Sequence, residues 1–373
     1  MKTIRIVAAD DSAVMRSLLT RMFAGAPTSI EARLELCGAV QDGASCLHAV
    51  RTLLPDLVLL DLHMPGLGGL EAIVRLRLEW PRLPIIICSS ATENGAAATL
   101  EAFSYGASDY VTKPAGQVDA ESAMACLWTQ LAPKILALAL PQESLTDGKT
   151  NYAPGRGQQR VEAIGIGVST GGPATLEQLL PCLPRDFPVP VMVVQHMPKL
   201  FTSALAARLD RCCAMRVKQA ASGIPLVPGT IWIAPGDSHM AAKMGSHGTA
   251  YLVLNQGERL HHCRPAVDVL FRSLAQTYGA GTLGVVLTGM GADGLEGSRA
   301  IVNAGGAVLA QDQASSAVWG MPGRIVGAAL ARAVLPLDKL GEELVRLISY
   351  GRSSIAEAFR FDRARDEVRH GLY

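Results

Sequence analysis

The 373-residue sequence has almost no net charge, because its 34 lysines and arginines are matched by 33 aspartates and glutamates, for a formal charge of +1. This balance provides no overall positive field for phosphates, so nucleic acid is not an expected partner. The eight cysteines include no C-x-x-C pair, and the sequence has neither zinc-ligand spacing nor an H-E-x-x-H motif. We interpret the cysteines as reduced thiols of a cytoplasmic protein.

Long hydrophobic runs are also missing. The opening residues MKTIRIVAADDS reach two aspartates before the core of an export signal could form, and no later apolar run approaches the roughly 20 residues of a membrane helix. We therefore expect a cytoplasmic protein with no direct membrane insertion. The apolar content of 49% instead predicts a globular chain that is long enough for two domains with separate cores.

The first part of the chain, residues 1–125, alternates short apolar runs with segments long enough for crossover helices. This alternation predicts an α/β domain with a doubly wound parallel sheet, and ligands of such sheets bind beyond the carboxyl ends of the strands. The expected strands are 3–9, 34–40, 56–62, 84–90 and 107–113.

Polar residues follow four of these strands. The carboxylates of Asp10, Asp11 and Asp61 would make an oxygen-rich site for a hard cation such as Mg²⁺. Ser89 and Lys113 would add a hydroxyl group and a positive charge opposite the carboxylates. A single aspartate at a strand end often caps a helix, but capping does not account for five such positions in order.

These residues carry a resemblance. Residues 1–125 resemble the receiver domain of two-component response regulators through four motifs, DDS at 10–12, DLHMPGLGGLE at 61–71, SS at 89–90 and YVTKP at 110–114. The resemblance implies a flavodoxin-like domain with a parallel five-stranded sheet and Asp61 as the phosphoacceptor. It further implies Mg²⁺ bound by Asp10, Asp11, Asp61 and the backbone carbonyl of His63, and three switch residues, namely Ser89 (in preference to Ser90), Tyr110 and Lys113.

Two positions depart from the receiver pattern. His63 stands where an acidic or amide residue is common, and Gly68 where receivers usually have Asp. Neither belongs to the acidic cluster. Residues 117–140 could close this domain with a helix, and the Pro, Gly and polar residues of 141–160 predict a linker. The expected organisation is a receiver domain at 1–125, the end of its closing helix and a linker at 126–160, a catalytic domain at 161–350 and a charged tail at 351–373, solvated as a helix or disordered.

After the predicted linker the strand pattern returns. Near-continuous apolar runs alternate again with helical segments, which predicts a second doubly wound, mostly parallel α/β domain. The expected strands are 161–168, 189–195, 229–234, 250–255, 283–289 and 307–312. The short connection between 229–234 and 250–255 suggests that these two strands form a hairpin.

The segment GIGVSTGG, residues 165–172, follows the first strand of this domain and precedes a helical segment. A dinucleotide-binding loop is one interpretation of its glycines, but their spacing is G-x-G-x-x-x-G, and the next strand ends in Gln195 and His196 instead of a ribose-binding acid. A Walker loop is supported even less, because the segment lacks the Gly-Lys-Ser/Thr of that motif. The alternative is a nucleophile elbow, because GVSTG satisfies G-x-S-x-G in a strand-turn-helix context.

Two more polar residues follow strands of this domain. His196 comes after VMVVQ and Asp293 after LGVVLTGMGA, so both could meet Ser169 in one crevice. A serine hydroxyl needs a base to take its proton, and a carboxylate that orients the base, so the three form a candidate triad. Taken singly, each has a plain structural role as a helix cap, a hydrogen-bonded histidine or a turn residue. No predicted strand delivers the histidine pair 261–262.

The second domain also carries a resemblance. Residues 161–350 resemble the catalytic domain of the chemotaxis protein-glutamate methylesterase and glutaminase family, through IGVSTGGP, QHMP, PGTIWIAPGDSHM, CRPAVDVLF, LTGMGADG and DQASSAVWGMPG. The resemblance implies Ser169 as nucleophile, His196 as base and Asp293 as orienting acid, and we expect the backbone amides of Thr170 and Met290 as oxyanion donors.

The same resemblance implies methylated chemoreceptors as substrates, a chemotaxis histidine kinase as phosphodonor, activation by phosphorylation and no cofactor for the ester hydrolysis. Two alternatives remain open from the residues themselves. The second domain could be a non-catalytic signalling scaffold, or it could bind a nicotinamide cofactor. A DNA-binding output domain is not expected, because the sequence shows no compact basic helix-turn-helix.

Overall fold

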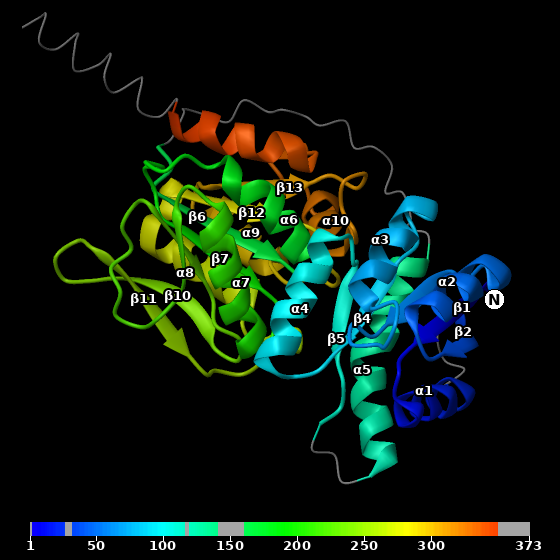
Figure 1. Cartoon of the computed structure of the whole chain (residues 1–373). Helices are drawn as coiled ribbons and strands as arrows, with labels where there is room; N and C mark the ends of the chain where they lie inside the picture. The colour runs from blue at the N-terminus through cyan, green and yellow to red at the C-terminus, as the bar shows by residue number, and fades with distance from the viewer. Residues whose placement is uncertain (1, 27–31, 116–118, 141–159, 350–373) are drawn as a thin grey trace, which may run out of the picture. The chain divides into compact units, whose positions relative to one another are not determined.

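A computed structural model describes residues 2–26, 32–115, 119–140 and 160–349. The predicted linker up to residue 159 and the predicted tail lie outside the described residues. The chain forms two compact units, one built mainly from residues before 145 and the other mainly from residues after that point. Figure 1 labels their helices and strands, and each unit is described below by itself.

The N-terminal unit is a five-stranded parallel sheet in the order β2-β1-β3-β4-β5, so the predicted doubly wound sheet and its five strands are confirmed. Each strand is followed by a helix, as Figure 1 shows. The elements are β1 Lys2–Ala9, α1 Ala13–Ala24, β2 Ala32–Val40, α2 Gly43–Leu53, β3 Leu57–Leu60, α3 Gly69–Glu79, β4 Ile85–Ser89, α4 Glu93–Ser104, β5 Asp109–Thr112 and α5 Ala120–Ala139.

Helix α5 corrects one prediction from the sequence. Its 20 residues are long and apolar enough to cross a membrane by length and composition, although no such run was expected. Its buried side chains, among them Leu127 and Leu131, belong to the apolar core of the N-terminal unit, and the helix packs on α1 and β5. It continues to Ala139, so the predicted boundary at residue 125 falls inside it.

The C-terminal unit is built on a seven-stranded sheet in the order β14-β13-β12-β6-β7-β9-β8, and every neighbouring pair is parallel. Residues 337–349 are helical as well. The elements are β6 Ala163–Val168, α6 Gly172–Leu179, η1 Leu180–Cys182, β7 Val191–Gln195, α7 Lys199–Cys212, β8 Arg216–Gln219, β9 Thr230–Ile233, β10 His239–Met244, β11 Ala250–Asn255, α8 Val267–Tyr278, η2 Gly279–Gly281, β12 Thr282–Val286, α9 Leu295–Asn303, β13 Ala307–Gln311, α10 Gly320–Gly327 and β14 Ala333–Leu335.

The predicted hairpin between 229–234 and 250–255 is wrong. Strand β9 lies inside the large sheet between β7 and β8, and β11 pairs with β10 in a separate antiparallel ribbon. The segment HMAAKM, which forms β10, has few β-branched or aromatic residues, so propensity did not reveal it. Strands β8 and β14 also went unpredicted; each has only three or four residues.

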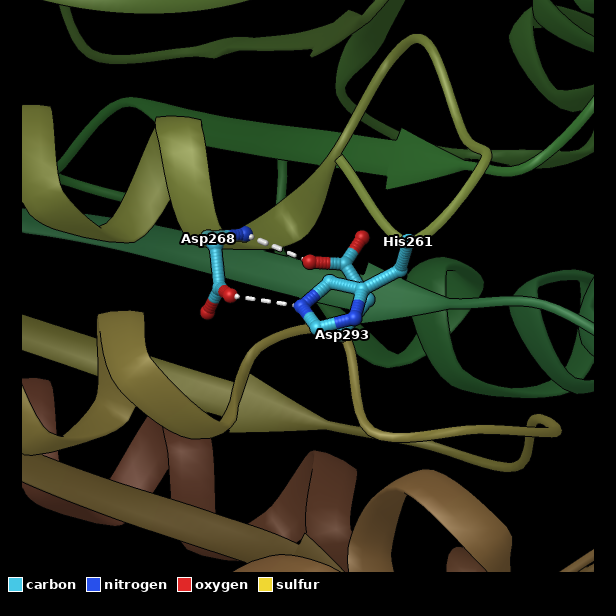
Figure 2. Close-up of side chains that lie close together, drawn as sticks. All are labelled: His261, Asp268 and Asp293. Carbon is cyan, nitrogen blue, oxygen red and sulfur yellow. Dashed lines mark hydrogen bonds and ion pairs between the residues drawn. The ribbon is translucent and has the colours of Figure 1, made fainter. Parts of the chain in front are cut away.

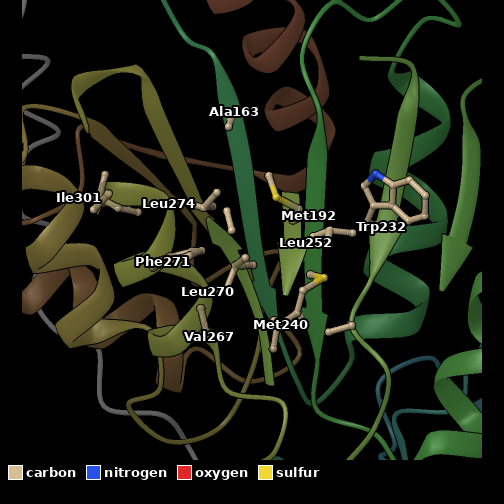
Figure 3. Packing of buried hydrophobic residues seen from close by; sticks show 14 of the residues in the cluster. Ala163, Met192, Trp232, Met240, Leu252, Val267, Leu270, Phe271, Leu274 and Ile301 are labelled. Carbon is tan, nitrogen blue, oxygen red and sulfur yellow. The ribbon is translucent and has the colours of Figure 1, made fainter. Parts of the chain in front are cut away.

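The main core of this unit lies between the large sheet and α8, and Figure 3 shows part of it. Helix α8 approaches β6 so closely that Gly165 and Gly167 have no room for a side chain. A Cβ on Gly165 would lie 2.6 Å from a methyl carbon of Leu274, and one on Gly167 would overlap Val267. These two glycines therefore serve packing inside a strand, which removes the support for a dinucleotide loop.

Candidate active site and acidic site

The three residues of the candidate triad lie at the carboxyl-end edge of the large sheet. Ser169 directly follows β6 and His196 directly follows β7, and Asp293 lies in the turn between β12 and α9. Strand β6 has β12 on one side and β7 on the other, so the chain reverses its direction of winding there. Such a topological switch point is where open α/β sheets bind ligands.

Backbone hydrogen bonds fix the turn that carries Ser169. Its N–H donates to the carbonyl of Thr288 at 3.0 Å, and its own carbonyl accepts from Gly172 N at 2.8 Å and Gln195 Nε2 at 2.9 Å. Gly171 adopts a φ of +77°, which a residue with a side chain would adopt only under strain, and α6 begins immediately after it. The strand, tight turn and helix expected of a nucleophile elbow are therefore present.

His196 lies beside Ser169 because their strands are neighbours. The backbone N–H of His196 donates to the carbonyl of Val168 at 3.3 Å, which extends the β6–β7 ladder by one residue. Its Nε2 lies 2.8 Å from Oδ2 of Asp293, so histidine and aspartate form the expected pair. In the described part of the chain the Ser169 hydroxyl makes no hydrogen bond, so Ser169 and His196 follow neighbouring strands without a hydrogen bond between their side chains.

Electrostatics favour an ionised His–Asp pair. Burial would lower the pKa of His196, but the hydrogen bond to Asp293 and the influence of Cys263 outweigh burial and raise the pKa above the ordinary 6.5. Burial would likewise raise the pKa of Asp293, yet His196 and the backbone amides of Asp268 and Val267 hold it below the ordinary 3.8. The pair is therefore suited to hold a proton on the imidazole.

Helix α8 supplies the two amides that hold this carboxylate. Val267 N donates to Oδ2 of Asp293 at 2.7 Å, and Asp268 N donates to Oδ1 at 2.9 Å. Both belong to the first turn of α8, where amides have no partner within the helix and favour a negative charge. Asp293 is 2% exposed, so these bonds fix its orientation in a largely dry site.

The amides of Thr170 and Met290 lie next to Ser169. Neither has a hydrogen-bond partner within the described residues. A Cβ on Gly289 would lie 2.8 Å from Ser169 Cβ, which places the turn preceding Met290 directly against the serine. The Thr288 hydroxyl donates to the carbonyl of Thr170 at 2.9 Å and joins the two turns.

In the N-terminal unit the sheet brings the predicted acidic residues together. Asp10 follows β1 and Asp61 follows β3, its neighbour in the sheet, and oxygens of Asp10, Asp11 and Asp61 lie within 4.8 Å of one another. Lys113 Nζ lies 2.8 Å from Asp10 Oδ2 and 2.7 Å from Asp61 Oδ2. Burial opposes the charge of Lys113, but the two carboxylates outweigh burial and raise its pKa.

The donor set of this acidic site fits Mg²⁺. It consists of carboxylate oxygens, which Mg²⁺ prefers. Asp10 Oδ2 is buried without a well-directed hydrogen bond, although Lys113 is near, and burial raises the pKa of Asp10 against the opposing effect of Lys113. A buried, poorly satisfied oxygen of this kind is a ligand available to a cation. His63 N donates to Asp61 Oδ1 at 3.3 Å, so its carbonyl lies on the same turn.

The predicted switch residues occupy neighbouring strand ends. Ser89 ends β4 and is 4% exposed; its hydroxyl donates to the Gly95 carbonyl at 3.1 Å and accepts from Thr99 at 2.7 Å. In this structure the hydroxyl thus bonds to α4. Tyr110 in β5 is buried, which raises the pKa of its phenol, and its ring meets Phe103 edge to face with centroids 6.1 Å apart.

Sequence reasoning missed three contributors to the candidate active site. These are the amides of the first turn of α8, the thiol of Cys263 beside the imidazole, and His261, whose Nε2 lies 3.2 Å from Asp268 Oδ2. The block CRPAVDVLF was recognised as a motif without a role for any of its residues. Its apolar spacing indicates a helix, but not that the first turn of this helix donates hydrogen bonds to Asp293.

Two family descriptions match the chain. Residues 164–344 match CheB methylesterase, and residues 6–125 match the response regulator receiver domain. Two relatives, both named protein-glutamate methylesterase/protein-glutamine glutaminase, align over nearly the whole chain. The protein of Trichodesmium erythraeum is 41% identical over 93% of this chain and 100% of its own length, and that of a Nocardioides species is 42% identical over 96% and 99%.

A solved structure is also similar. The crystal structure of the CheB methylesterase catalytic domain of Thermotoga maritima shares 40% sequence identity with this chain. It aligns over 51% of this chain and all of its own length, with a TM-score of 0.49.

Proposed function

Because the chain belongs to the CheB methylesterase family and carries a receiver domain ahead of the catalytic domain, we propose that Ser169, His196 and Asp293 hydrolyse glutamate methyl esters on chemoreceptors. The chain is a protein-glutamate methylesterase and protein-glutamine glutaminase of that family. The observation that carries the proposed mechanism is the 2.8 Å His196–Asp293 pair beside a serine elbow.

The reaction follows from these positions. Ser169 Oγ attacks the γ-carbonyl carbon while His196 takes the hydroxyl proton, and the negative charge moves to the carbonyl oxygen. Asp293 already engages Nε2, so Nδ1 is the nitrogen left for the serine proton. The protonated imidazole then gives this proton to the leaving methanol. Water attacks the glutamyl ester through the same base and releases the carboxylate and free serine; with a glutamine substrate the leaving group is ammonia.

The amides of Thr170 and Met290 are the proposed oxyanion donors. Their lack of partners and their position beside Ser169 support this role. Amide donors that point at the developing charge stabilise it without reorganisation, and loss of one such donor typically costs ~3 kcal/mol in the transition state.

The acidic site of the receiver domain is proposed to control the esterase. Asp61 would accept a phosphoryl group from a chemotaxis histidine kinase, and Lys113 and Ser89 would bind that group. Asp10, Asp11, Asp61 and the carbonyl of His63 would hold Mg²⁺, which neutralises phosphoryl charge when bound. Tyr110 would change its packing in response. The family resemblance implies that the methylated glutamates lie on cytoplasmic helices of the chemoreceptors, so the cytoplasm is the expected compartment.

The nucleophile is tested with methyl-labelled receptor. We expect methanol release by the wild-type chain and a loss of at least about 10³-fold in Ser169→Ala, because the covalent step disappears. Ser246→Ala is the matched control, since Ser246 is exposed in the turn between β10 and β11. Unchanged release from Ser169→Ala would refute the catalytic assignment and favour a non-catalytic scaffold.

The control by phosphorylation is tested in the same assay. A small phosphodonor with Mg²⁺ should stimulate methanol release by the wild-type chain. Asp61→Asn has an amide in place of the nucleophilic carboxylate and should lose this stimulation, whereas Ser246→Ala should keep it. Stimulation of Asp61→Asn equal to that of the wild type would refute Asp61 as the acceptor.

A further inference from the structure

A second histidine–aspartate pair lies next to the catalytic one. His261 Nε2 is 3.2 Å from Oδ2 of Asp268, and Figure 2 shows both side chains beside Asp293. Asp268 is almost completely buried, at 1% exposed, whereas the side chain of His261 is 46% exposed. The pair thus joins a buried carboxylate to a solvent-exposed imidazole.

The two pairs share the start of α8. The backbone N–H of Asp268 donates to Asp293 Oδ1, while the side chain of Asp268 accepts from His261 and, at 2.7 Å, from Gly297 N. One ligand atom from each of His261, Asp268 and Asp293 lies within 4.8 Å of the other two. Three N–H donors, from Val267, Asp268 and Gly297, already point at the two carboxylates, and such donors repel a cation. This arrangement therefore favours charge coupling over a metal site.

The coupling is electrostatic. Two neighbouring buried carboxylates repel each other, and the negative charge of Asp268 also favours a proton on His196 through Asp293. Two groups can compensate the charge of Asp268, namely the guanidinium of Arg272 at 3.9 Å and the imidazole of His261 at 3.2 Å when it is protonated. Arg272 stays charged at all relevant pH values, whereas histidine ordinarily changes charge between about pH 5 and 8. The uncompensated part of the Asp268 charge therefore depends on His261.

The groups that face His261 define what it can influence. Asp268 and Arg272 belong to α8, and Asp293 lies in the turn after β12. His262 and Cys263 are its neighbours in its own loop, and Cys263 also contacts His196 at the end of β7. His262 has no ion pair within the described residues, although it shares the left-handed backbone of His261, with φ values of 62° and 51°.

We propose that Asp268 and His261 are positioning residues that act through Asp293 to set the basicity of His196. This inference rests on the proposed function, in which His196 is the base. Ionised Asp268 raises the proton affinity of His196, and protonated His261 lowers it again. The solvent-exposed His261 thereby influences the basicity of His196 through Asp268 and Asp293.

The test is the pH dependence of kcat/KM for methanol release. His196 must be neutral to accept the serine proton, so its raised pKa places the acid limb of the wild-type profile above pH 6.5. Asp268→Asn removes a negative charge and should move the midpoint of this limb to lower pH by about half a unit or more. His261→Arg puts a permanent cation beside Asp268 and should therefore move the midpoint to lower pH than His261→Asn, which has no positive charge at that position.

His262→Asn is the matched control, because it removes a histidine from the same left-handed turn without touching Asp268; its midpoint should equal that of the wild type. Asparagine tolerates that backbone, so strain does not distinguish the variants. If Asp268→Asn does not fold, the two His261 variants decide the question. Equal midpoints for His261→Arg and His261→Asn would overturn the inference. Loss of activity in every variant without a shift would mean a structural role.

The same data separate this inference from the proposed function. If methanol release does not depend on Ser169, the proposed function itself fails. If release depends on Ser169 and the midpoints stay together, only the coupling of His261 and Asp268 fails.

Discussion

Single residues around Ser169 leave very little free space. Gly289 packs against the serine, and a Cβ there would lie 2.8 Å from Ser169 Cβ and 3.1 Å from Ser169 N. The backbone nitrogen of Ser169 cannot move without shifting the turn after β6. The position of Ser169 thus depends on the absence of a side chain at Gly289 in the neighbouring turn.

We expect Gly289→Ala to lower kcat by about 10²-fold, because a displacement of the nucleophile by a fraction of an ångström to 1 Å spoils its alignment. Methanol release from methyl-labelled receptor measures the effect. Gly68→Ala is the control, since its φ is −68° and the nearest atom lies 4.0 Å from the added carbon. Full activity in Gly289→Ala would contradict this packing.

At this scale the sequence indicated the positions of the candidate residues well and the atoms that support them poorly. Ser169, His196 and Asp293 each follow an apolar strand, a relation that is local in sequence and could be read directly. The amides of Val267 and Asp268 and the thiol of Cys263 reach the triad only through the tertiary packing of α8. Backbone donors carry no residue-type signal, so a motif search has no means to find them.

Among the elements, α8 has the largest part in arranging the candidate active site. It packs on β6, β10, β12 and α9, and its first turn holds Asp293. Ser273 joins it to β10, since its hydroxyl accepts from Ala242 N at 2.9 Å and donates to the Leu270 carbonyl at 2.7 Å. The Ser273 side chain, in the middle of α8, thus provides the hydrogen-bond acceptor for a buried amide of the antiparallel β10–β11 ribbon.

Ser273→Ala should destabilise the catalytic domain by about 1–3 kcal/mol, because Ala242 N–H would stay buried without a partner. Each kcal/mol corresponds to a Tm decrease of about 2–4 °C in a domain of this size. Thermal unfolding followed by circular dichroism measures the change. Ser246→Ala, in the exposed turn of the same hairpin, should leave Tm unchanged; equal Tm values for the two variants would refute this role of Ser273.

Element prediction succeeded where apolar runs were long and failed where they were short or mixed. Strands β6, β7 and β12 are fully buried and were predicted. Strand β10 alternates little and contains Lys243, so neither composition nor periodicity marked it, and β11 was assigned the wrong partner. Strand pairing is set by contacts distant in sequence, which a local pattern does not encode.

On the scale of the whole molecule, two parallel sheets each place their polar residues at a topological switch point. In the N-terminal sheet it lies between β1 and β3, which carry Asp10 and Asp61, and in the C-terminal sheet beside β6, which carries Ser169. The acidic site and the candidate active site thus belong to different sheets, with no residue in common. The two chemistries should therefore respond separately to removal of a metal ion.

Chelation of divalent ions should abolish the stimulation of methanol release by a small phosphodonor, because the proposed Mg²⁺ ligands surround the phosphoacceptor. Release without the phosphodonor should continue at its previous rate, and added Mg²⁺ should restore the stimulation. Measurements before and after chelation, with Ser169→Ala as the blank, test both parts. Undiminished stimulation in the chelator would refute the assignment of the acidic site to Mg²⁺.

The close contact between β6 and α8 determines which substitutions would abolish activity without altering a residue of the candidate active site. Gly165 and Gly167 face α8, whose first turn grips Asp293. A bulkier residue at either glycine would push α8 away from β6 and weaken the hydrogen bonds from its first turn to Asp293, while the sheet itself stays folded. A genetic screen for lost demethylation would consequently count these two strand glycines among the active-site positions, although neither would ever touch the receptor.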